Sequence, residues 1–320
     1  MIALLAPGQG SQTPGMLTPW LDDPASEETL AEWSAATGLD LRRLGTTAAA
    51  DEITDTAVTQ PLIVAVTLIA AARLAARVEL PAAAPAAGHS VGELAAAAVA
   101  RVLSPGVAVT FAAARGREMA AACALEPTGM SAVLGGDSEA VLATLAKLGL
   151  DPANRNGAGQ IVAAGPVAAL AALAENPPER ARVVALPVAG AFHTRFMAPA
   201  EDALRAYAAG ISPTDPARPL LSNTDAAVVT DGTDALSRLV AQVTRPVRWD
   251  SCMAALRELG VTAVIELPPA GKLVGLVKRE LKGTAMLALK TPDDLDAAVD
   301  LINTHARDVH GARIDTGATR

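Results

Sequence analysis

The residues best suited to chemistry lie in the segment Ala87-Gly88-His89-Ser90-Val91-Gly92-Glu93, which has the Gly-x-Ser-x-Gly spacing of a nucleophile elbow. In such an elbow, a tight turn between a strand and a helix holds a serine hydroxyl clear of the backbone. The turn brings strand and helix so close that small residues are needed on either side, and Gly88 and Gly92 meet this need. Backbone N–H groups at the start of the helix favour negative charge, which suits a tetrahedral oxyanion. The spacing predicts that Ser90 is a nucleophile, although a glycine-flanked serine also occurs at ordinary strand-to-helix turns.

A serine nucleophile needs a base, and the obvious candidate is one of the four histidines. His89 adjoins the serine, and neighbours on such a turn point apart. His193 lies in an apolar segment just after a predicted strand, where a solvated histidine would gain nothing, so we expect it to be the base. The main competing interpretation is the Ser-Asp-His order of α/β-hydrolases, which would place the base late in the chain, at His305 or His310.

Two further segments carry polar residues that could bind a ligand. Arg115 lies on an otherwise apolar predicted helix, and a buried arginine needs a partner. A protein carboxylate is the common partner, and a substrate carboxylate is the alternative. The loop Gly8-Gln9-Gly10-Ser11-Gln12 has two glycines that let the backbone come close to a ligand, but it lacks the Gly-Lys-Ser/Thr ending of a P-loop.

The composition narrows the function classes. The chain of 320 residues is 51% hydrophobic but only 2% aromatic, and its net charge is −8, which argues against nucleic acid as a partner. Cys123 and Cys252 show no metal or redox spacing, so we expect reduced thiols, no metal site and a cytoplasmic protein. The start of the chain lacks the charged residues of a signal peptide. The longest apolar run, residues 61–72, is too short to span a bilayer, and we expect no membrane association.

The elements that must position these residues indicate an α/β fold with a mostly parallel sheet. Short apolar runs predict strands, and alanine-rich segments between them predict helices. Strands are expected at 2–6, 80–87, 130–134, 153–156, 160–164, 182–187, 220–223 and 261–265. Helices are expected at 27–50, 61–78, 110–122, 138–148, 166–174, 199–209, 236–243 and 272–282.

The order of elements between residues 125 and 190 is β-α-β-β-α-β, which is the ferredoxin-like arrangement. We therefore predict a small ferredoxin-like domain at 125–190, inserted into a large α/β-hydrolase-like catalytic domain formed by 1–124 and 191–302. Residues 303–320 are expected to be a loose polar C-terminal tail.

Taken together, five motifs resemble the malonyl-CoA:acyl-carrier-protein transacylase family. They are Gly8-Gln9-Gly10-Ser11-Gln12, Gly88-His89-Ser90-Val91-Gly92-Glu93, Arg115-Gly116 with Met119, Ala191-Phe192-His193-Thr194, and Gln242 before Pro246-Val247-Arg248-Trp249. The resemblance is to the stand-alone enzyme of type II fatty-acid synthesis and to related acyltransferase domains of polyketide synthases, and it covers residues 1–290 in order and spacing. One departure is the segment Leu267-Pro268-Pro269-Ala270-Gly271, where the family has a Gly-Pro-Gly turn, and we expect a local loop change there.

The resemblance implies a role for each matching residue. Ser90 is the nucleophile, and His193 is first general base and then general acid, oriented by the backbone carbonyl of Gln242. The other implied roles are the oxyanion hole at the backbone N–H groups of Gln9 and Val91, the malonyl carboxylate partner Arg115, and the substrate-binding residues Met119, Phe192 and Gln242. The Ala-Phe-His form around Phe192 is similar to malonyl-selective members of the family.

The resemblance also implies a reaction and its partners. Malonyl would pass from malonyl-CoA to Ser90 and then to the phosphopantetheine thiol of acyl carrier protein, in a ping-pong mechanism without a cofactor other than the coenzyme A thioester itself. We expect a monomer. The sequence leaves open whether the carrier belongs to fatty-acid or polyketide synthesis. A serine esterase or thioesterase of the α/β-hydrolase type, and a catalytically silent scaffold that binds carrier protein, are the alternative functions.

The acidic carrier protein would need a basic surface on this acidic chain. The predicted helix 272–282 carries Lys272, Lys278, Arg279 and Lys282, and together with Arg195 and Arg248 it is our hypothesis for that surface. The simpler interpretation is a solvated helix face.

Overall fold

Six strands form the central sheet of the computed structural model, which describes residues 1–311, with side chains as far as residue 306. Along the sheet the order is β10 (Ala285–Ala288), β9 (Ala263–Glu266), β1 (Ile2–Ala6), β2 (Ala86–Gly88), β7 (Leu220–Leu221) and β8 (Val228–Val229). Neighbouring strands are parallel except β7 and β8. Every residue of β1 is buried, as expected for a parallel strand with both faces covered by helices. The fold is α/β, as the sequence predicts.

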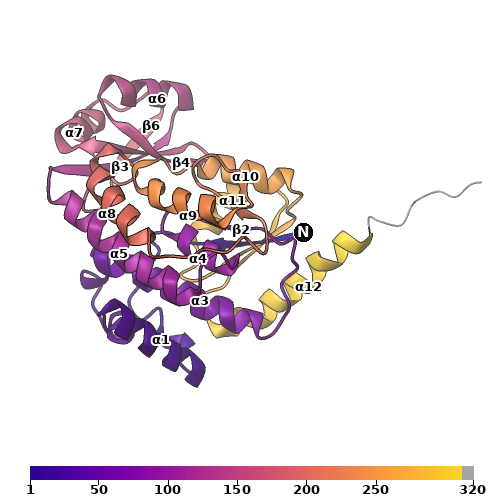
Figure 1. Ribbon diagram of the computed structural model, residues 1–320. Coiled ribbons are helices and arrows are strands. Elements are labelled where there is room, and N and C mark those ends of the chain that lie inside the picture. The colour runs from indigo at the N-terminus through magenta and orange to yellow at the C-terminus, as the bar shows by residue number, and fades with distance from the viewer. Residues whose placement is uncertain (312–320) are drawn as a thin grey trace, which may run out of the picture.

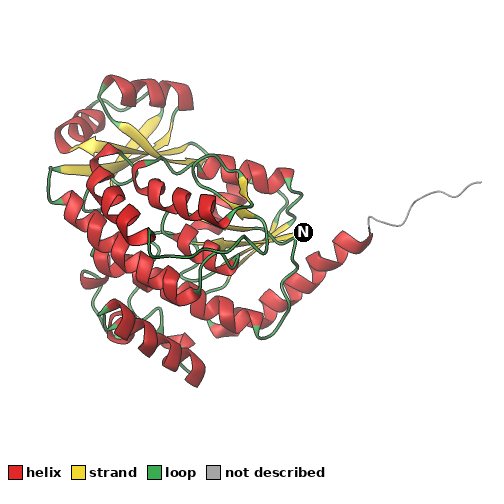
Figure 2. Cartoon of the chain, viewed as in Figure 1, coloured by secondary structure: helices red, strands yellow, loops and turns green. Residues whose placement is uncertain are grey.

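Helices cover both faces of this sheet (Figures 1 and 2). Because side chains alternate along a strand, Ile2 and Leu4 pack on one face and Ala3 on the other. The hydrophobic core on the first face includes residues of eight helices: α1 (Pro24–Thr37), α2 (Leu41–Thr46), α3 (Thr56–Ala75), α4 (Gly92–Val99), α5 (Pro105–Cys123), α8 (Ala198–Ala208), α9 (Gly232–Ala241) and α12 (Leu295–Gly311). The second face meets α10 (Trp249–Glu258) and α11 (Lys272–Glu280). The 3-10 turns are η1 (Thr18–Trp20), η2 (Glu52–Thr54), η3 (Arg195–Met197), η4 (Gln242–Thr244) and η5 (Pro292–Asp294).

Helix α3 is the one helix in the described part of the chain that is long and apolar enough to cross a membrane, judged by length and composition alone. Its apolar window is 72% buried inside the protein, where it packs against α5. The helix begins five residues before the predicted start at Pro61, because the Asp55 side chain accepts a hydrogen bond from the Ala57 N–H and caps it. Pro61 therefore lies inside the helix and not near its start.

A second, antiparallel sheet is formed between α5 and α8. It has the order β4 (Asp151–Gly157), β5 (Gln160–Pro166), β3 (Thr128–Gly135) and β6 (Ala181–Ala185). One face packs on α6 (Ser138–Lys147) and α7 (Val167–Glu175), which lie on the outer side in Figure 1. The elements follow the predicted β-α-β-β-α-β order. Asp137, and not Ser138, caps α6, since its side chain accepts from the Ala140 N–H.

The C-terminal segment differs from its prediction. Helix α12 continues to Gly311, so the loose tail predicted from residue 303 is wrong for residues 303–311, and the rest of the predicted tail lies outside the described residues. Leu295, Ala298 and Ile302 recur on one side of this helix and are fully or almost fully buried. This apolar stripe holds an otherwise polar helix against the core. Strands β8 and β10 and helix α10 were also missed by the sequence analysis.

Candidate active site

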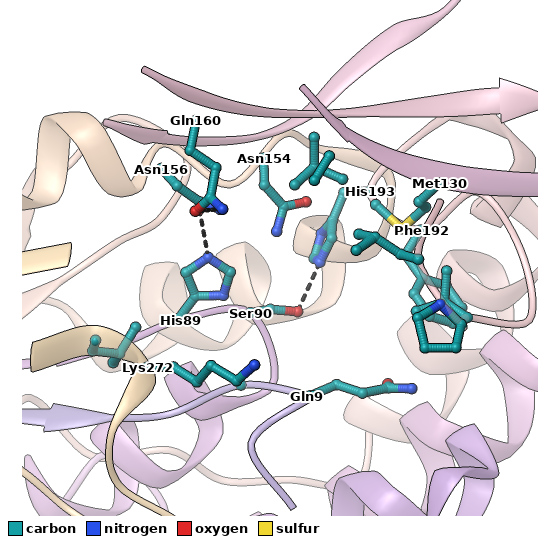
Figure 3. Close-up of a pocket in the computed structure, with 18 of the residues that line it drawn as sticks. Gln9, His89, Ser90, Met130, Asn154, Asn156, Gln160, Phe192, His193 and Lys272 are labelled. Atoms are coloured by element: carbon teal, nitrogen blue, oxygen red, sulfur yellow. Dashed lines mark hydrogen bonds between the residues drawn. The ribbon is translucent and has the colours of Figure 1, made fainter. Parts of the chain in front are cut away.

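The carboxyl ends of the parallel strands meet at one edge of the central sheet, where α/β proteins bind their ligands. The loop after β1 carries Gln9, the turn after β2 carries Ser90, and the turn after β7 carries Asn223. A cavity of about 500 Å³ opens over this edge. The face of the second sheet that is turned away from α6 and α7 supplies its opposite wall, including Met130 and Val162. The site therefore lies between the two sheets (Figure 3).

The turn after β2 has the strained geometry of a nucleophile elbow. Ser90 has a φ of 55°, a left-handed conformation that non-glycine residues rarely adopt. A Cβ on Gly88 would lie 2.1 Å from the carbonyl carbon of Gly92, and one on Gly92 would lie 2.3 Å from the Ala6 carbonyl oxygen. Both glycines are needed for close approach, as the sequence predicts.

Ser90 and His193 meet in the cavity although 103 residues separate them. The distance from Ser90 Oγ to His193 Nε2 is 2.7 Å, and the distance from His193 Nδ1 to the backbone oxygen of Gln242 is 2.9 Å. Because a carbonyl oxygen only accepts, Nδ1 carries the proton and Nε2 is left as the acceptor for the serine hydroxyl (Figure 3). The structure thus brings together Ser90, His193 and Gln242, for which the family resemblance implies the roles of nucleophile, base and orienting carbonyl.

The electrostatic surroundings keep His193 neutral. Its side chain is buried, and burial together with the positive charge of Arg115 lowers the pKa of His193 from 6.5 to about 3. At neutral pH the imidazole is therefore unprotonated at Nε2 and able to accept a proton. His305, the competing base, lies elsewhere, with Nδ1 at 2.7 Å from Thr262 Oγ1. The side chain of His310 lies outside the described residues.

The guanidinium of Arg115 lies beside the serine hydroxyl and is only 1% exposed. Its Nη1 donates to Gln60 Oε1 at 2.6 Å, and its Nη2 donates to Gln242 Oε1 at 2.9 Å and lies 3.4 Å from Ser90 Oγ. Within the described chain, no carboxylate lies within ion-pair distance of Arg115. Burial lowers the pKa of Arg115 to about 10, so the group stays positive at neutral pH. The second hydrogen of Nη1 has no acceptor in the described chain, and the second hydrogen of Nη2 is directed at Ser90 Oγ, so the guanidinium still has donor capacity on the side of the cavity.

Two backbone amides next to the nucleophile make no hydrogen bond to any acceptor among residues 1–311. They are the N–H groups of Gln9 and Val91, the predicted oxyanion donors. Val91 is 1% exposed, so its amide is shielded from water. The side chain of Gln9 is held by a hydrogen bond from Nε2 to Thr56 Oγ1 at 3.3 Å. Free N–H groups at this position suit a developing oxyanion.

Met119 and Phe192 form part of the apolar lining, as expected for substrate-binding residues. Met119 is 1% exposed and Phe192 is 6% exposed. Met119 Sδ lies 3.5 Å from Gln60 Nε2, which fixes the glutamine whose carbonyl contacts Arg115. Gln60 was missed by the sequence analysis. The available signal was a glutamine inside the apolar run of α3, where an unpaired polar group would be costly.

His89 was set aside in the sequence analysis because neighbours on a turn point apart. The ring does point away from the Ser90 hydroxyl, and its Nε2 lies 2.9 Å from Asn156 Oδ1 on the second sheet (Figure 3). Asn156 Nδ2 in turn donates to Gln160 Oε1 at 3.2 Å. His89 therefore links the elbow to the opposite wall of the cavity. No local pattern in the sequence predicts this contact.

The basic residues of the predicted docking surface have different environments. Lys272 and Arg279 line the cavity, and Lys278 is exposed on the same helix α11. Arg195 forms an ion pair with Asp151 at 3.1 Å, and Arg248 forms one with Asp250 at 3.0 Å. The segment 267–271 that departs from the family pattern is the turn between β9 and α11. In the described part of the chain, no cluster of three or more His, Cys, Asp or Glu side chains is placed to hold a metal ion.

Comparisons with known proteins show the family and the fold. Residues 4–313 match a family described as "Acyl transferase domain". A malonyl CoA-acyl carrier protein transacylase of Mycobacterium tuberculosis is 60% identical over 302 residues, covering 94% of this chain and all of the relative. The crystal structure of MCAT from the same organism has a TM-score of 0.90 at 59% identity and covers 93% of this chain and 99% of that chain. A malonyl-transacylase solved in complex with a type II PKS acyl-carrier protein has a TM-score of 0.86 at 30% identity, with 93% and 99% covered.

Proposed function

The chain is an acyltransferase that belongs to the acyl transferase family, and we propose that it moves malonyl from malonyl-CoA to acyl carrier protein through an ester on Ser90. The proposal takes its substrate and partner from relatives that match nearly the whole chain. One of these relatives was solved with an acyl-carrier protein bound. The pathway that supplies the carrier, fatty-acid or polyketide synthesis, is left open by the residues of the site.

One observation carries the choice of malonyl. A positively charged guanidinium lies 3.4 Å from the nucleophile and is held by two neutral glutamine carbonyls, not by a protein acid. A malonyl group has a free carboxylate at its far end, and an acetyl group has none. A buried arginine that stays unpaired costs several kcal/mol by the usual penalty for stranding one partner of an ion pair. Arg115 therefore favours an acyl group that brings its own negative charge.

In the first half-reaction, Ser90 Oγ attacks the thioester carbonyl carbon while its proton passes to His193 Nε2. The carbonyl oxygen becomes an oxyanion, and each well-placed N–H donor, at Gln9 and Val91, stabilises it by about 3–4 kcal/mol. The C–S bond then breaks, and His193 returns the proton to the leaving sulfur of coenzyme A. The product is a malonyl ester on Ser90.

In the second half-reaction the same residues work in reverse. The phosphopantetheine thiol gives its proton to His193 Nε2, and its sulfur attacks the ester carbonyl carbon. Collapse of the second oxyanion breaks the C–O bond, and Ser90 Oγ recovers the proton from His193. Nucleophile, base and oxyanion donors all come from the chain, so we propose that no cofactor or metal takes part beyond the coenzyme A thioester substrate.

Several finer statements belong to the same proposal. We describe residues 1–124 and 191–302 as an α/β-hydrolase-like catalytic domain, on the strength of the elbow and the parallel sheet. Residues 125–190 are described as ferredoxin-like because of their β-α-β-β-α-β order. We also propose a monomer in the cytoplasm. Free cysteines, the buried position of α3 and the net charge of −8 are consistent with this location and with partners other than membranes or nucleic acids.

The proposal is tested by intact-mass spectrometry after mixing the protein with malonyl-CoA. We expect a single malonyl adduct that maps to Ser90, disappears on addition of holo acyl carrier protein, and is absent from Ser90→Ala. The adduct should form much faster than the acetyl adduct from acetyl-CoA. A protein that hydrolyses simple esters but never carries malonyl on Ser90 would be the serine esterase or thioesterase of the alternative interpretation.

A further inference from the structure

A buried acidic residue behind the active site has no part in the mechanism above. Glu93 lies in the first turn of α4, three residues after the nucleophile, and is 5% exposed. Charged side chains are almost never buried unless they are paired. In the sequence, Glu93 is the last residue of the elbow motif, and no role was predicted for it beyond its place at the start of a helix.

Both carboxyl oxygens of Glu93 accept a hydrogen bond from an N–H group. Oε1 accepts from the backbone N–H of Asn223 at 2.7 Å, and Oε2 accepts from the side-chain Nε2 of Gln242. Burial raises the pKa of Glu93 to about 8, even though the Asn223 N–H and the charge of Arg115 act in the opposite direction. Burial favours the neutral acid, but both oxygens face N–H donors in the structure, and this arrangement favours the ionised carboxylate.

The side chain of Gln242 lies between Glu93 and Arg115. Its Nε2 faces Glu93 and the Ser90 carbonyl oxygen, the latter at 3.1 Å, and its Oε1 accepts from Arg115 Nη2 at 2.9 Å. The two ends of an amide have opposite hydrogen-bonding roles, so the direction of Gln242 depends on its neighbours. With an acceptor-only carboxylate on one side, the amide nitrogen must face Glu93, and the carbonyl must face Arg115.

We propose that Glu93 is a positioning residue for acyl-group selectivity, which fixes the direction of the Gln242 amide and thereby holds the Arg115 guanidinium in place for a substrate carboxylate. The inference rests on the function proposed above. The amide separates the acid from the arginine, so that Arg115 has a compensating negative charge nearby without a direct ion pair. A direct ion pair would compete with the carboxylate of the substrate.

The test is Glu93→Gln, because a glutamine amide has the same shape as the carboxylate but cannot accept a hydrogen bond at both of its ends, whichever way the amide is turned. Its NH₂ group would face either the Asn223 N–H or Gln242 Nε2, and each is a donor. Initial rates of Ser90 acylation are measured with malonyl-CoA and acetyl-CoA and divided by the fraction of active protein. We expect the ratio of kcat/KM for malonyl-CoA to that for acetyl-CoA to fall by about tenfold or more, mostly through a higher KM for malonyl-CoA.

The matched control is Cys252→Ala. Cys252 is also buried and reaches the same network through Asn223 Nδ2 at 3.9 Å, but it makes no hydrogen bond to Gln242 in the described chain. A residue that only supports the fold would lower both rates together and leave the ratio unchanged, and this is our expectation for Cys252→Ala. The same result in Glu93→Gln would overturn the inference. Where Glu93→Gln is insoluble, Glu93→Asp gives the same readout, since its shorter carboxylate is withdrawn from Gln242. A wild-type protein without a malonyl adduct would instead refute the proposed function.

Discussion

The two walls of the cleft are built in different ways. On the wall formed by the central sheet, His193, Arg115 and Gln242 are each 4% exposed or less, and every one is held by hydrogen bonds to other parts of that wall. Ser90 and His193 also adopt left-handed backbone conformations, with φ of 55° and 61°. Such strain persists only where the surroundings over-determine the geometry.

The wall formed by the second sheet is looser. Asn154 and Gln160 are only partly buried, and the buried Oδ1 of Asn154 has no hydrogen-bond partner in the described chain. Two backbone hydrogen bonds tie strand β4 to Val247: the Arg155 N–H donates to the Val247 oxygen at 2.9 Å, and the Val247 N–H donates to the Ala153 oxygen at 2.8 Å. The other ties of β4 to the rest of the protein include the side-chain contacts of Asp151 and Asn156 given above. The contrast indicates that the central sheet fixes the reacting atoms, where small misplacements are costly, and the second sheet encloses the substrate.

The largest effect is expected from removal of the base on the first wall. His193→Ala leaves the Ser90 hydroxyl without a proton acceptor, so the rate of Ser90 acylation by malonyl-CoA should fall by about a thousandfold or more. Stopped-flow or quenched mass spectrometry measures this rate. Asn156→Ala on the second wall is the matched comparison and should cost far less. Similar losses in both variants would contradict the division of labour between the walls.

The next effect concerns selectivity. Arg115→Ala removes the partner of the malonyl carboxylate, and we expect the preference for malonyl-CoA over acetyl-CoA to fall by about a hundredfold, in line with the loss of a buried charged partner. The measurement is the ratio of kcat/KM values. Asn156→Ala should lower both values by the same factor. An Arg115→Ala protein with an unchanged preference for malonyl-CoA over acetyl-CoA would favour the esterase interpretation, because a simple esterase does not bind a substrate carboxylate through the guanidinium.

The burial of the base should also appear in the pH dependence of stability. The pKa of His193 is lowered from 6.5 to about 3, so between these pH values the unfolded chain binds a proton that the folded protein does not. The contribution of neutral His193 to the free energy of unfolding is fully present above pH 6.5. It is lost as the pH falls below 6.5, by at most about 1.4 kcal/mol per pH unit. Urea unfolding at several pH values should show a shallower slope for His193→Gln than for the wild type. Equal slopes would show that His193 titrates normally.

The smallest effect is expected at the mouth of the cleft. Charge reversal at Lys278 and Arg279 on α11 should raise the Michaelis constant for acyl carrier protein by about two- to fivefold, as is usual for exposed charges. The Michaelis constant for malonyl-CoA should change less, above all in the single reversal at Lys278, which is exposed and does not line the cavity as Arg279 does. Lys147→Glu on the outer helix α6 is the control, since it reverses an exposed charge away from the cavity. Equal changes for both substrates would reject α11 as the docking surface.

The elbow shows what could be inferred from the sequence. Gly88, Ser90 and Gly92 lie within five residues, and the close approach they permit is a local property of the backbone, so their spacing was sufficient. His193 was identified by excluding the other histidines, and Arg115 by its apolar surroundings. The roles of Gln9, Val91, Met119, Phe192 and Gln242 came from the family resemblance.

The residues that hydrogen-bond to these site residues could not be predicted from the sequence in the same way. Gln60 and Asn156 have chemically ordinary neighbours along the chain, and Glu93 stands at the end of the elbow motif without a recognisable partner nearby in the sequence. Their contacts are with residues far away in the sequence. The extent of α12 was missed for a related reason, because the packing of Leu295, Ala298 and Ile302 against the core holds this helix in place. The start of α3 was misplaced for a different reason, since the local cap at Asp55 was overlooked.

The residue order alone predicts the nucleophile, the strand and helix around it, and the class of chemistry, because each follows from the steric and hydrogen-bonding demands of a few adjacent residues. The packing of the chain is what places Arg115 against the neutral amide carbonyls of Gln60 and Gln242, with the carboxylate of Glu93 on the far side of the Gln242 amide. Side-chain pairing depends on which strands become neighbours in a sheet, and that order is set by the packing of the whole chain.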